Sequence, residues 1–367
     1  MKSESHRKVL RRGLCAGLVM LAACGGGDDS SMGSGYVATS LVSDVNMSTN
    51  PYSSPHTDAN LVNAWGIAFN PQGFVWVANN ATSTSTLYDG SGVPQSLVVA
   101  IPPGTAGPAK PTGIVFSASQ SFQVSQGGVA GASRFIFAGE AGTIAGWAPN
   151  VNLTNAITVF DGASAGKIYK GLALGSQAGA DRLFASDFHN GLVDVFDANF
   201  APIAVAGGFI DANLPAGYAP FGIQVIGSLV YVAYAKQDAA REDEEAGAGL
   251  GIVNTFDLSG TLVKRLIPAG GKLNAPWGMA MAPANFGAFS NALLVANFGD
   301  GHINAYDPTT GASLGTLSTP AGMAIAIEGL WGIAFGNGIN GQPTNTLFYA
   351  AGPADETHGV YGRIDTR

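Results

Sequence analysis

The chain has 367 residues, and 52 of them are glycine, about twice the share that is usual in globular proteins. Only 11% of the residues are charged and 46% are apolar, which excludes a disordered chain, because disorder needs high charge and few apolar residues. So much glycine argues against long helices, since glycine costs about 1 kcal/mol per helix position relative to alanine. The formal net charge of −8 leaves no basic surface for nucleic acid. We therefore expect short strands joined by tight turns, and no nucleic-acid partner.

The first residues resemble a bacterial lipoprotein signal. Basic residues precede an apolar run, Gly13 to Ala23, that is too short to span a bilayer but fits the core of a signal peptide. Small residues then lead to Cys24, the position at which such signals are cleaved and lipidated. We expect residues 1–23 to be removed, residues 24–35 to form a flexible tether, and the mature protein to be an outer-membrane lipoprotein anchored by its lipid. An ordinary signal peptide with a coincidental cysteine is the alternative.

A short apolar strand with glycine at its second position recurs six times, at spacings of 47 to 58 residues. Each copy is followed by further strand patterns, and the third strand often ends in an aromatic residue and aspartate. Four strands per repeat of this size is typical of a propeller blade, so the sequence predicts an all-β, six-bladed β-propeller over residues 36–367. The six copies are Trp65–Phe69, Thr112–Phe116, Lys170–Leu174, Phe221–Val225, Trp277–Met281 and Trp331–Phe335.

The two ends of the repeat region predict how the ring closes. The sixth copy runs out after a third strand at Val360–Ile364, while the alternating segment Tyr36–Val42 precedes the first copy and has no partner there. We expect Tyr36–Val42 to become the outer strand of the last blade. This pairing would remove two open sheet edges.

Three stretches carry a family resemblance: Leu61–Phe69, Tyr234–Asp238 and Gly352–Gly359. Together with the repeats, they resemble an uncharacterised bacterial family of exported propellers, related in style to NHL and YVTN repeat proteins. The resemblance covers nearly all of the chain after residue 35. It implies the propeller fold and adds no activity.

Strand order predicts which residues share a face. In antiparallel blades, the loops between second and third strands lie on the same face as the connections into the next blade, and we term this the channel face. Functional residues of propellers usually surround the channel there. His56, His189, His302 and His358 all fall on it. We expect His189 or His358 to act as a general acid or base, although histidines also occur in polar loops without any function.

A column of polar residues on this face predicts a cation site. Asn79, Asp187 and Asn297 occupy one position at the exits of the second strands, and Asp355 joins them if the sixth blade is aligned on Gly359. Carboxylate and amide oxygens suit a hard divalent cation, with Ca²⁺ favoured. The set is similar to the metal site of gluconolactonase-type propellers, but the glutamate that this family supplies in blade 1 is missing. Alternatively, these side chains only satisfy the backbone groups of turns.

The residues that open the inner strands are further candidates. Aromatic side chains there could form a ligand funnel or could wedge the blades together, and Lys170 joins the catalytic candidates because it replaces an aromatic residue near the axis. The charge run Arg241–Glu245 is typical of a solvated, mobile insertion, with a cation-binding lid as the alternative. The ligand-binding candidates are His56, Trp65, Lys110, Glu140, Phe221, Asp238, Trp277, Asp300, His302 and Trp331.

These observations lead to two functional hypotheses. The first is a membrane-anchored, monomeric binding module whose channel face holds a small molecule, a glycan or an envelope protein. The second is a metal-assisted hydrolase or lyase of the gluconolactonase type, acting on a lactone, ester or glycan. A propeller reveals its fold more readily than its function, so the sequence leaves both open.

Overall fold

The computed structural model describes residues 35–46, 54–177 and 179–367. They belong to one folded unit, Gly33–Arg367. The predicted signal, Cys24 and the predicted tether up to residue 34 lie outside the described residues. The described chain is almost entirely β structure, with two short 3-10 helices, η1 (Ala163–Ala165) and η2 (Gly287–Phe289). Within these ranges, no helix is long and apolar enough to cross a membrane.

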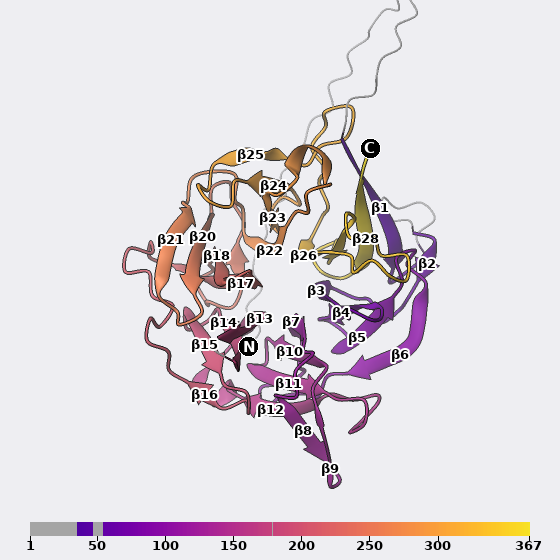
Figure 1. Ribbon diagram of the computed structural model, residues 1–367, viewed down its shortest axis with the longest axis vertical. Coiled ribbons are helices and arrows are strands. Elements are labelled where there is room, and N and C mark those ends of the chain that lie inside the picture. The colour runs from indigo at the N-terminus through magenta and orange to yellow at the C-terminus, as the bar shows by residue number, and fades with distance from the viewer. Residues whose placement is uncertain (1–34, 47–53, 178) are drawn as a thin grey trace, which may run out of the picture. The chain divides into compact units, whose positions relative to one another are not determined.

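Six antiparallel sheets form the blades of a six-bladed β-propeller, as predicted (Figure 1). The innermost strands contact each other in cyclic order and close the ring. Blade 1 is β3 (Ala64–Phe69), β4 (Val75–Asn79), β5 (Thr84–Tyr88) and β6 (Pro94–Ala100). Blade 2 is β7 (Pro111–Phe116), β10 (Phe135–Gly139), β11 (Thr143–Trp147) and β12 (Ile157–Asp161). Blade 3 is β13 (Tyr169–Gln177), β14 (Ala180–Asp187), β15 (Leu192–Phe196) and β16 (Pro202–Ile203).

The remaining blades include the one that closes the ring. Blade 4 is β17 (Tyr218–Ile226), β18 (Leu229–Gln237), β20 (Gly251–Asp257) and β21 (Leu262–Ile267). Blade 5 is β22 (Pro276–Met281), β23 (Leu293–Asn297), β24 (Ile303–Tyr306) and β25 (Ser313–Thr316). Blade 6 combines β26 (Leu330–Phe335), β27 (Leu347–Ala351) and β28 (Val360–Thr366) with β1 (Tyr36–Ser43). The antiparallel pairing of β1 with β28 confirms the predicted closure by the N-terminal strand.

Three additions decorate this repeat. The hairpin of β8 (Gln123–Gln126) and β9 (Val129–Ala132) is inserted between the first two strands of blade 2. A two-residue strand, β2 (His56–Thr57), pairs with β1 in parallel. Another, β19 (Glu244–Glu245), pairs with the end of β18 on the channel face, and this last addition shapes the site described below.

The recurring glycine of the inner strands has a packing cause. A Cβ atom built on Gly278 would lie 2.5 Å from the carbonyl oxygen of Trp331 in the next blade. The other five copies meet the backbone of the following blade in the same way, and Gly332 of blade 6 meets Trp65 of blade 1. Inner strands therefore approach too closely for any side chain at this position. The six glycines are Gly66, Gly113, Gly171, Gly222, Gly278 and Gly332.

Apolar side chains narrow the channel just beyond these glycines. The residue after each glycine lines a small cavity of 30 Å³ on the axis. The first halves of the inner strands are almost entirely buried, and an unpaired charge placed there would be strongly destabilising. The six lining residues are Ile67, Ile114, Leu172, Ile223, Met279 and Ile333.

A candidate binding site on the channel face

Aromatic rings fill the centre of the ring next to the channel face. Trp331 stacks on Trp65 with 3.7 Å between ring centroids and on Phe298 with 3.9 Å. Trp277 and Phe221 meet Trp331 edge-on. Trp65, Phe221 and Trp331 are buried, which favours the interpretation as wedges between the blades; the ligand funnel stays a prediction. Aromatic packing of this kind stabilises a core through large buried area and ring geometry.

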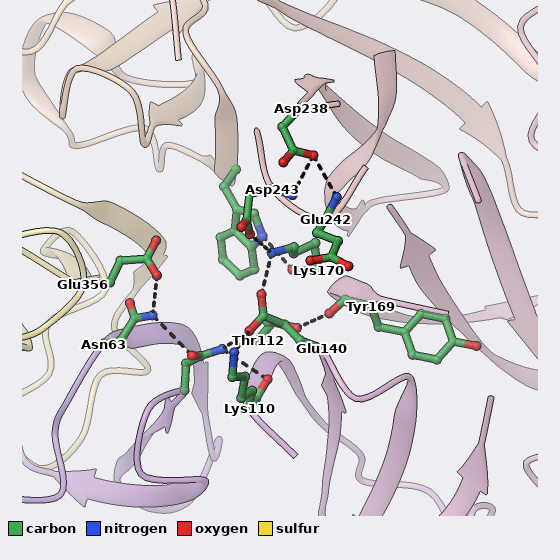
Figure 2. A network of polar contacts seen from close by, with 12 residues as sticks. Asn63, Lys110, Thr112, Glu140, Tyr169, Lys170, Asp238, Glu242, Asp243 and Glu356 are labelled. Atoms are coloured by element: carbon green, nitrogen blue, oxygen red, sulfur yellow. Dashed lines mark hydrogen bonds and ion pairs between the residues drawn. The ribbon is translucent and has the colours of Figure 1, made fainter. Parts of the chain in front are cut away.

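Lys170 interrupts this aromatic centre. It lies on β13 beside Trp65, and its side chain is only 1% exposed. The Nζ atom donates hydrogen bonds to Oε1 of Glu140 at 2.5 Å and to Oδ1 of Asp243 at 3.0 Å. It also lies 5.3 Å from the ring centroid of Trp65. One buried cation therefore joins carboxylates from blades 2 and 4 next to an aromatic face (Figure 2).

The loop between β18 and β20 delivers Asp243 to this lysine. Oδ1 of Asp238 accepts hydrogen bonds from the backbone of Glu242 and Asp243, which holds the turn. Pairing of β19 with β18 then fixes the following residues. The run Arg241–Glu245 thus folds back onto the sheet, and one of its carboxylates, Asp243, pairs with the buried lysine although most of the run is exposed. Its mobility stays a prediction.

A second chain of polar contacts approaches Glu140 from blades 1 and 6. Nδ2 of Asn80 donates to Oε2 of Glu140 at 3.1 Å, and Nδ2 of Asn63 donates to Oε2 of Glu356 at 3.0 Å. Asn63 also accepts a hydrogen bond from Nε1 of Trp331. Nδ2 of Asn63 also donates to Oδ1 of Asn80 at 3.3 Å, so the chain ties the aromatic centre to the carboxylates. Figure 2 shows Asn63, Glu356 and Glu140 within it.

Unusual backbone supports this arrangement. Asn63 and Lys110, each three residues before an inner-strand glycine, have φ of 49° and 46°. Ala354, Asp355 and Glu356 form a run of left-handed residues with φ of 57°, 52° and 64°. Such conformations cost about 1–2 kcal/mol for each residue that is not glycine. These five are among 13 non-glycine residues with positive φ in the described chain, so left-handed backbone occurs in the loops of this site and elsewhere.

Electrostatics keeps the lysine charged and two carboxyls partly protonated. Burial alone would lower the pKa of Lys170, but the carboxylates of Glu140, Glu244 and Asp243 raise it above its usual range. Burial raises the pKa of Glu244 to about 8, against the attraction of Lys170. Burial and the charge of Glu140 raise the pKa of Glu356 to about 7. The raised pKa favours the charged form of Lys170, and the raised pKa values of Glu244 and Glu356 favour their protonated forms near neutral pH. The catalytic role of Lys170 stays a prediction.

An open pocket lies directly against this cluster. Its volume is 230 Å³, and Lys110, Glu140, Glu242 and Asp243 contribute its charged walls. The side chains of Asp243 and Lys110 are 72% and 55% exposed. Nζ of Lys110 is 3.8 Å from Oε2 of Glu140. A solute in this pocket would therefore meet the same carboxylates that hold the buried lysine.

Three of the four predicted metal ligands share one position of the repeat, and the fourth does not. Asn79, Asp187 and Asn297 do end the second strands of their blades, at equivalent positions of the register. In blade 6 this position belongs to Ala351, so the alignment of Asp355 was wrong, because the longer loop there places Asp355 beyond the strand. Side chains of the first three bond within their own blades, as with Asn79 to Thr84 and Thr86.

Across residues 35–46, 54–177 and 179–367, no group of three or more His, Cys, Asp or Glu side chains is arranged to hold a metal ion. The Ca²⁺ site stays a prediction.

The four histidines lie on the channel face but apart from Lys170. His358 pairs with Asp44 at 2.8 Å, beside the strand that closes the ring, and His302 pairs with Asp300 at 3.3 Å. Nδ1 of His189 is buried without a hydrogen-bond partner in the described chain. Among the described residues, the hydrogen bonds of Lys170 and Glu140 involve no histidine. His56 lies on β2. The acid–base roles of His189 and His358 and the ligand-binding roles of His56 and His302 stay predictions.

Sequence reasoning found part of this site. Lys170, Glu140 and Lys110 were among the candidates. Asp243 and Glu244 entered only through the alternative of a cation-binding lid at Arg241–Glu245, and Glu356 was not a candidate. The charge run that contains Asp243 and Glu244 was the available signal, since an isolated acidic run in a chain of low charge needs a partner. Glu356 offered no such signal.

The fold and the site define the class of the protein, a six-bladed β-propeller with an ionic centre on its channel face. The TM-score is 0.55 with a Bacteroides thetaiotaomicron protein of unknown function, which is 12% identical, over 91% of this chain and 76% of that one. It is 0.50 with a streptogramin B lyase, 11% identical, over 93% and 100% of the two chains. It is also 0.50 with XC5397, a gluconolactonase of Xanthomonas campestris, 13% identical, over 84% and 87%. These likenesses concern the fold alone.

Sequence comparison identifies the family. The chain is 32% identical to uncharacterized protein R648 of Acanthamoeba polyphaga mimivirus, over 84% of this chain and 76% of the viral one. It is 30% identical to protein L690 of the same virus, over 84% and 81%. The chain belongs to the family of these viral proteins. They give no support to the bacterial exported family inferred from the sequence. No protein-family model matches the chain.

Proposed function

We propose that the channel face is a binding site for a small ligand that carries a positive charge. The observation that carries this proposal is the buried Lys170, whose partners Glu140 and Asp243 come from two other blades and also line an open pocket. Burying an ion pair is expensive, and apolar residues often stabilise a core better. A packing role alone would be served by an aromatic residue, as in the blades that carry tryptophan at this position.

Charge balance supports a cationic ligand. Two ammonium groups, those of Lys110 and Lys170, lie among more carboxyls than they can neutralise. Glu244 and Glu356 respond by retaining protons. A cation in the pocket would replace these protons and restore the balance. The carboxyls concerned are Glu140, Asp243, Glu244 and Glu356.

Calorimetric titration with 1,4-diaminobutane at pH 6.5, below the pKa values of Glu244 and Glu356, tests this proposal. Titrations in two buffers of different ionisation enthalpy would report the protons exchanged. We expect the diamine to bind and to release protons, because its positive charge next to Glu140 and Asp243 favours ionisation of Glu244 and Glu356, which interact electrostatically with that cluster. Glu356→Gln should lower the number of protons released, whereas Glu245→Gln, at an exposed position of β19, should not. Absence of binding at about 10 mM diamine, or binding without proton release, would contradict the proposal.

A hydrolase of the gluconolactonase type is the second candidate. It is favoured by Glu356, whose pKa of about 7 suits a general acid–base group at neutral pH. Turnover of glucono-δ-lactone that is lost in Glu356→Gln would support it, and activity unchanged in that variant would oppose it. Calcium binding belongs to the same proposal and is measured by titrating CaCl₂ in place of the diamine.

Membrane anchoring through Cys24, an outer-membrane location, a glycan or envelope partner and a monomeric state stay proposals as well. Metabolic labelling with palmitate in a bacterial host, compared between the full chain and Cys24→Ser, tests the lipid. Labelling of both chains or of neither would contradict it. Light scattering of residues 36–367 tests the monomer.

A further inference from the structure

A larger pocket lies on the face opposite the channel face, between blades 1 and 2. Its volume is 560 Å³, within the range that is typical of small-molecule sites. The turn between β3 and β4 and the ends of β7 and β11 surround it. Because strands alternate in direction, these segments lie at the other end of the blades from Lys170. The pocket is thus independent of the proposed cation site.

Aromatic rings form the buried wall of this pocket. Trp76 stacks on Phe135 with 4.0 Å between centroids and a tilt of 18°, and Trp147 lies 4.7 Å from Trp76. All three are almost fully buried. Phe74 and Phe116 are only partly buried and complete the aromatic lining. Such a wall favours a flat apolar ligand, which can stack on or against the rings.

One cation belongs to the same lining. Arg134 is partly buried, and its Nη1 atom donates to the carbonyl oxygens of Ser119 at 3.1 Å and Ser117 at 3.4 Å. Across the described residues, no carboxylate pairs with Arg134. Because its two hydrogen bonds within the described chain both come from Nη1, the N–H groups of Nε and Nη2 have no partner there. A planar guanidinium with free donors is suited to bind a carboxylate through two parallel hydrogen bonds.

We propose that this pocket binds a small aromatic carboxylate, whose ring packs against Trp76, Trp147 and Phe116 and whose carboxylate pairs with Arg134. The rings supply apolar burial, and the arginine supplies a charge that otherwise stays unpaired. Together, the rings and the arginine favour a ligand that carries an anionic group on a flat, apolar ring system. An uncharged aromatic compound would fill the same space and leave the guanidinium unpaired.

The test compares 2-naphthoate with 2-naphthamide, which differ in charge and share the ring system. Tryptophan fluorescence and saturation-transfer NMR would follow binding. We expect 2-naphthoate to bind with a Kd below about 1 mM and about tenfold or more tighter than the amide, since hydrogen bonds to charged groups contribute more than neutral ones. Arg134→Gln should remove the preference, and Arg134→Lys should retain part of it.

Two further variants serve as controls. Ala118→Trp places a large ring at the edge of the pocket and should weaken both probes, whereas Lys110→Gln on the channel face should affect neither. Equal affinity for the two probes, an unchanged preference in folded Arg134→Gln, or no binding of 2-naphthoate at about 1 mM would each overturn the proposal. If Arg134→Gln does not fold, Arg134→Lys decides: a preference as large as in the parent overturns it, because a lysine cannot reproduce the bidentate contact.

Discussion

Blades 3 and 6 carry chemically different side chains at the same position of the repeat, beside the axis: a charged one in blade 3 and an aromatic one in blade 6. Blade 6 places Trp331 before its inner-strand glycine, and the ring stacks between Trp65 and Phe298. Blade 3 places Lys170 at the same point of the repeat, where Glu140 and Asp243 must compensate its burial. The comparison shows that the repeat determines the backbone conformation at this position but not the type of side chain. An aromatic residue there adds stability, whereas an ion needs a network from other blades.

The largest expected effect concerns the aromatic half of this comparison. Trp331→Ala removes the central ring of the stack and the hydrogen bond from Nε1 to Asn63. We expect the free energy of unfolding to fall by about 3–5 kcal/mol, because a large cavity forms where the blades meet. Urea unfolding of residues 36–367 measures it. Phe289→Ala, at a partly buried ring at the edge of the molecule, is the control and should cost clearly less.

For the buried lysine of blade 3 we expect a slightly smaller loss in the free energy of unfolding. Lys170→Met keeps the length of the side chain and removes the charge, which leaves Glu140 and Asp243 without their cation. We expect a loss of about 3 kcal/mol, at the lower end of the range for a broken buried pair, because the carboxyls can take up protons. Lys110→Met is the matched control on the same face, since that lysine is 55% exposed. Equal stability of the two variants would contradict the burial of Lys170.

A glycine variant tests the close approach of the inner strands without changing Trp331 or Lys170. Gly278→Ala would place a methyl group 2.5 Å from the carbonyl oxygen of Trp331 and 3.0 Å from the amide nitrogen of Ile333. We expect a loss of about 1–3 kcal/mol from this overpacking. Gly271→Ala, whose added methyl group meets open space, should be nearly neutral. Thermal unfolding of the pair gives the difference.

The smallest effect is the dependence of stability on pH. Glu244 and Glu356 have pKa values of about 8 and about 7, above the ordinary 4.5. Between 4.5 and these values the folded protein holds protons that the unfolded chain has lost, so the free energy of unfolding decreases as pH rises through this window. Glu356→Gln should flatten the slope near pH 7, and Glu245→Gln should not. The same slope in the parent and in Glu356→Gln would contradict the placement of Glu356.

Much of the fold was predictable because it repeats. The six strands with glycine at their second position predicted the number of blades, and the segment Tyr36–Val42 without a neighbouring partner predicted how the ring closes. The site was less predictable, because its members come from different blades and from loops of unequal length. Asp355 illustrates this: the longer loop of blade 6 moves it out of the column that Asn79 and Asn297 share.

The sequence by itself determined the architecture of this protein, since glycine at the axis and strand periodicity are local features repeated six times. Only the tertiary structure decided which of the few charged residues meet. The sequence shows Asp243 only as part of a charged run, whereas the folded loop places its carboxylate, still 72% exposed, 3.0 Å from the buried Lys170. The physical reason is that periodicity reports on contacts within a blade, whereas a buried ion pair depends on long-range contacts between blades that leave no periodic pattern.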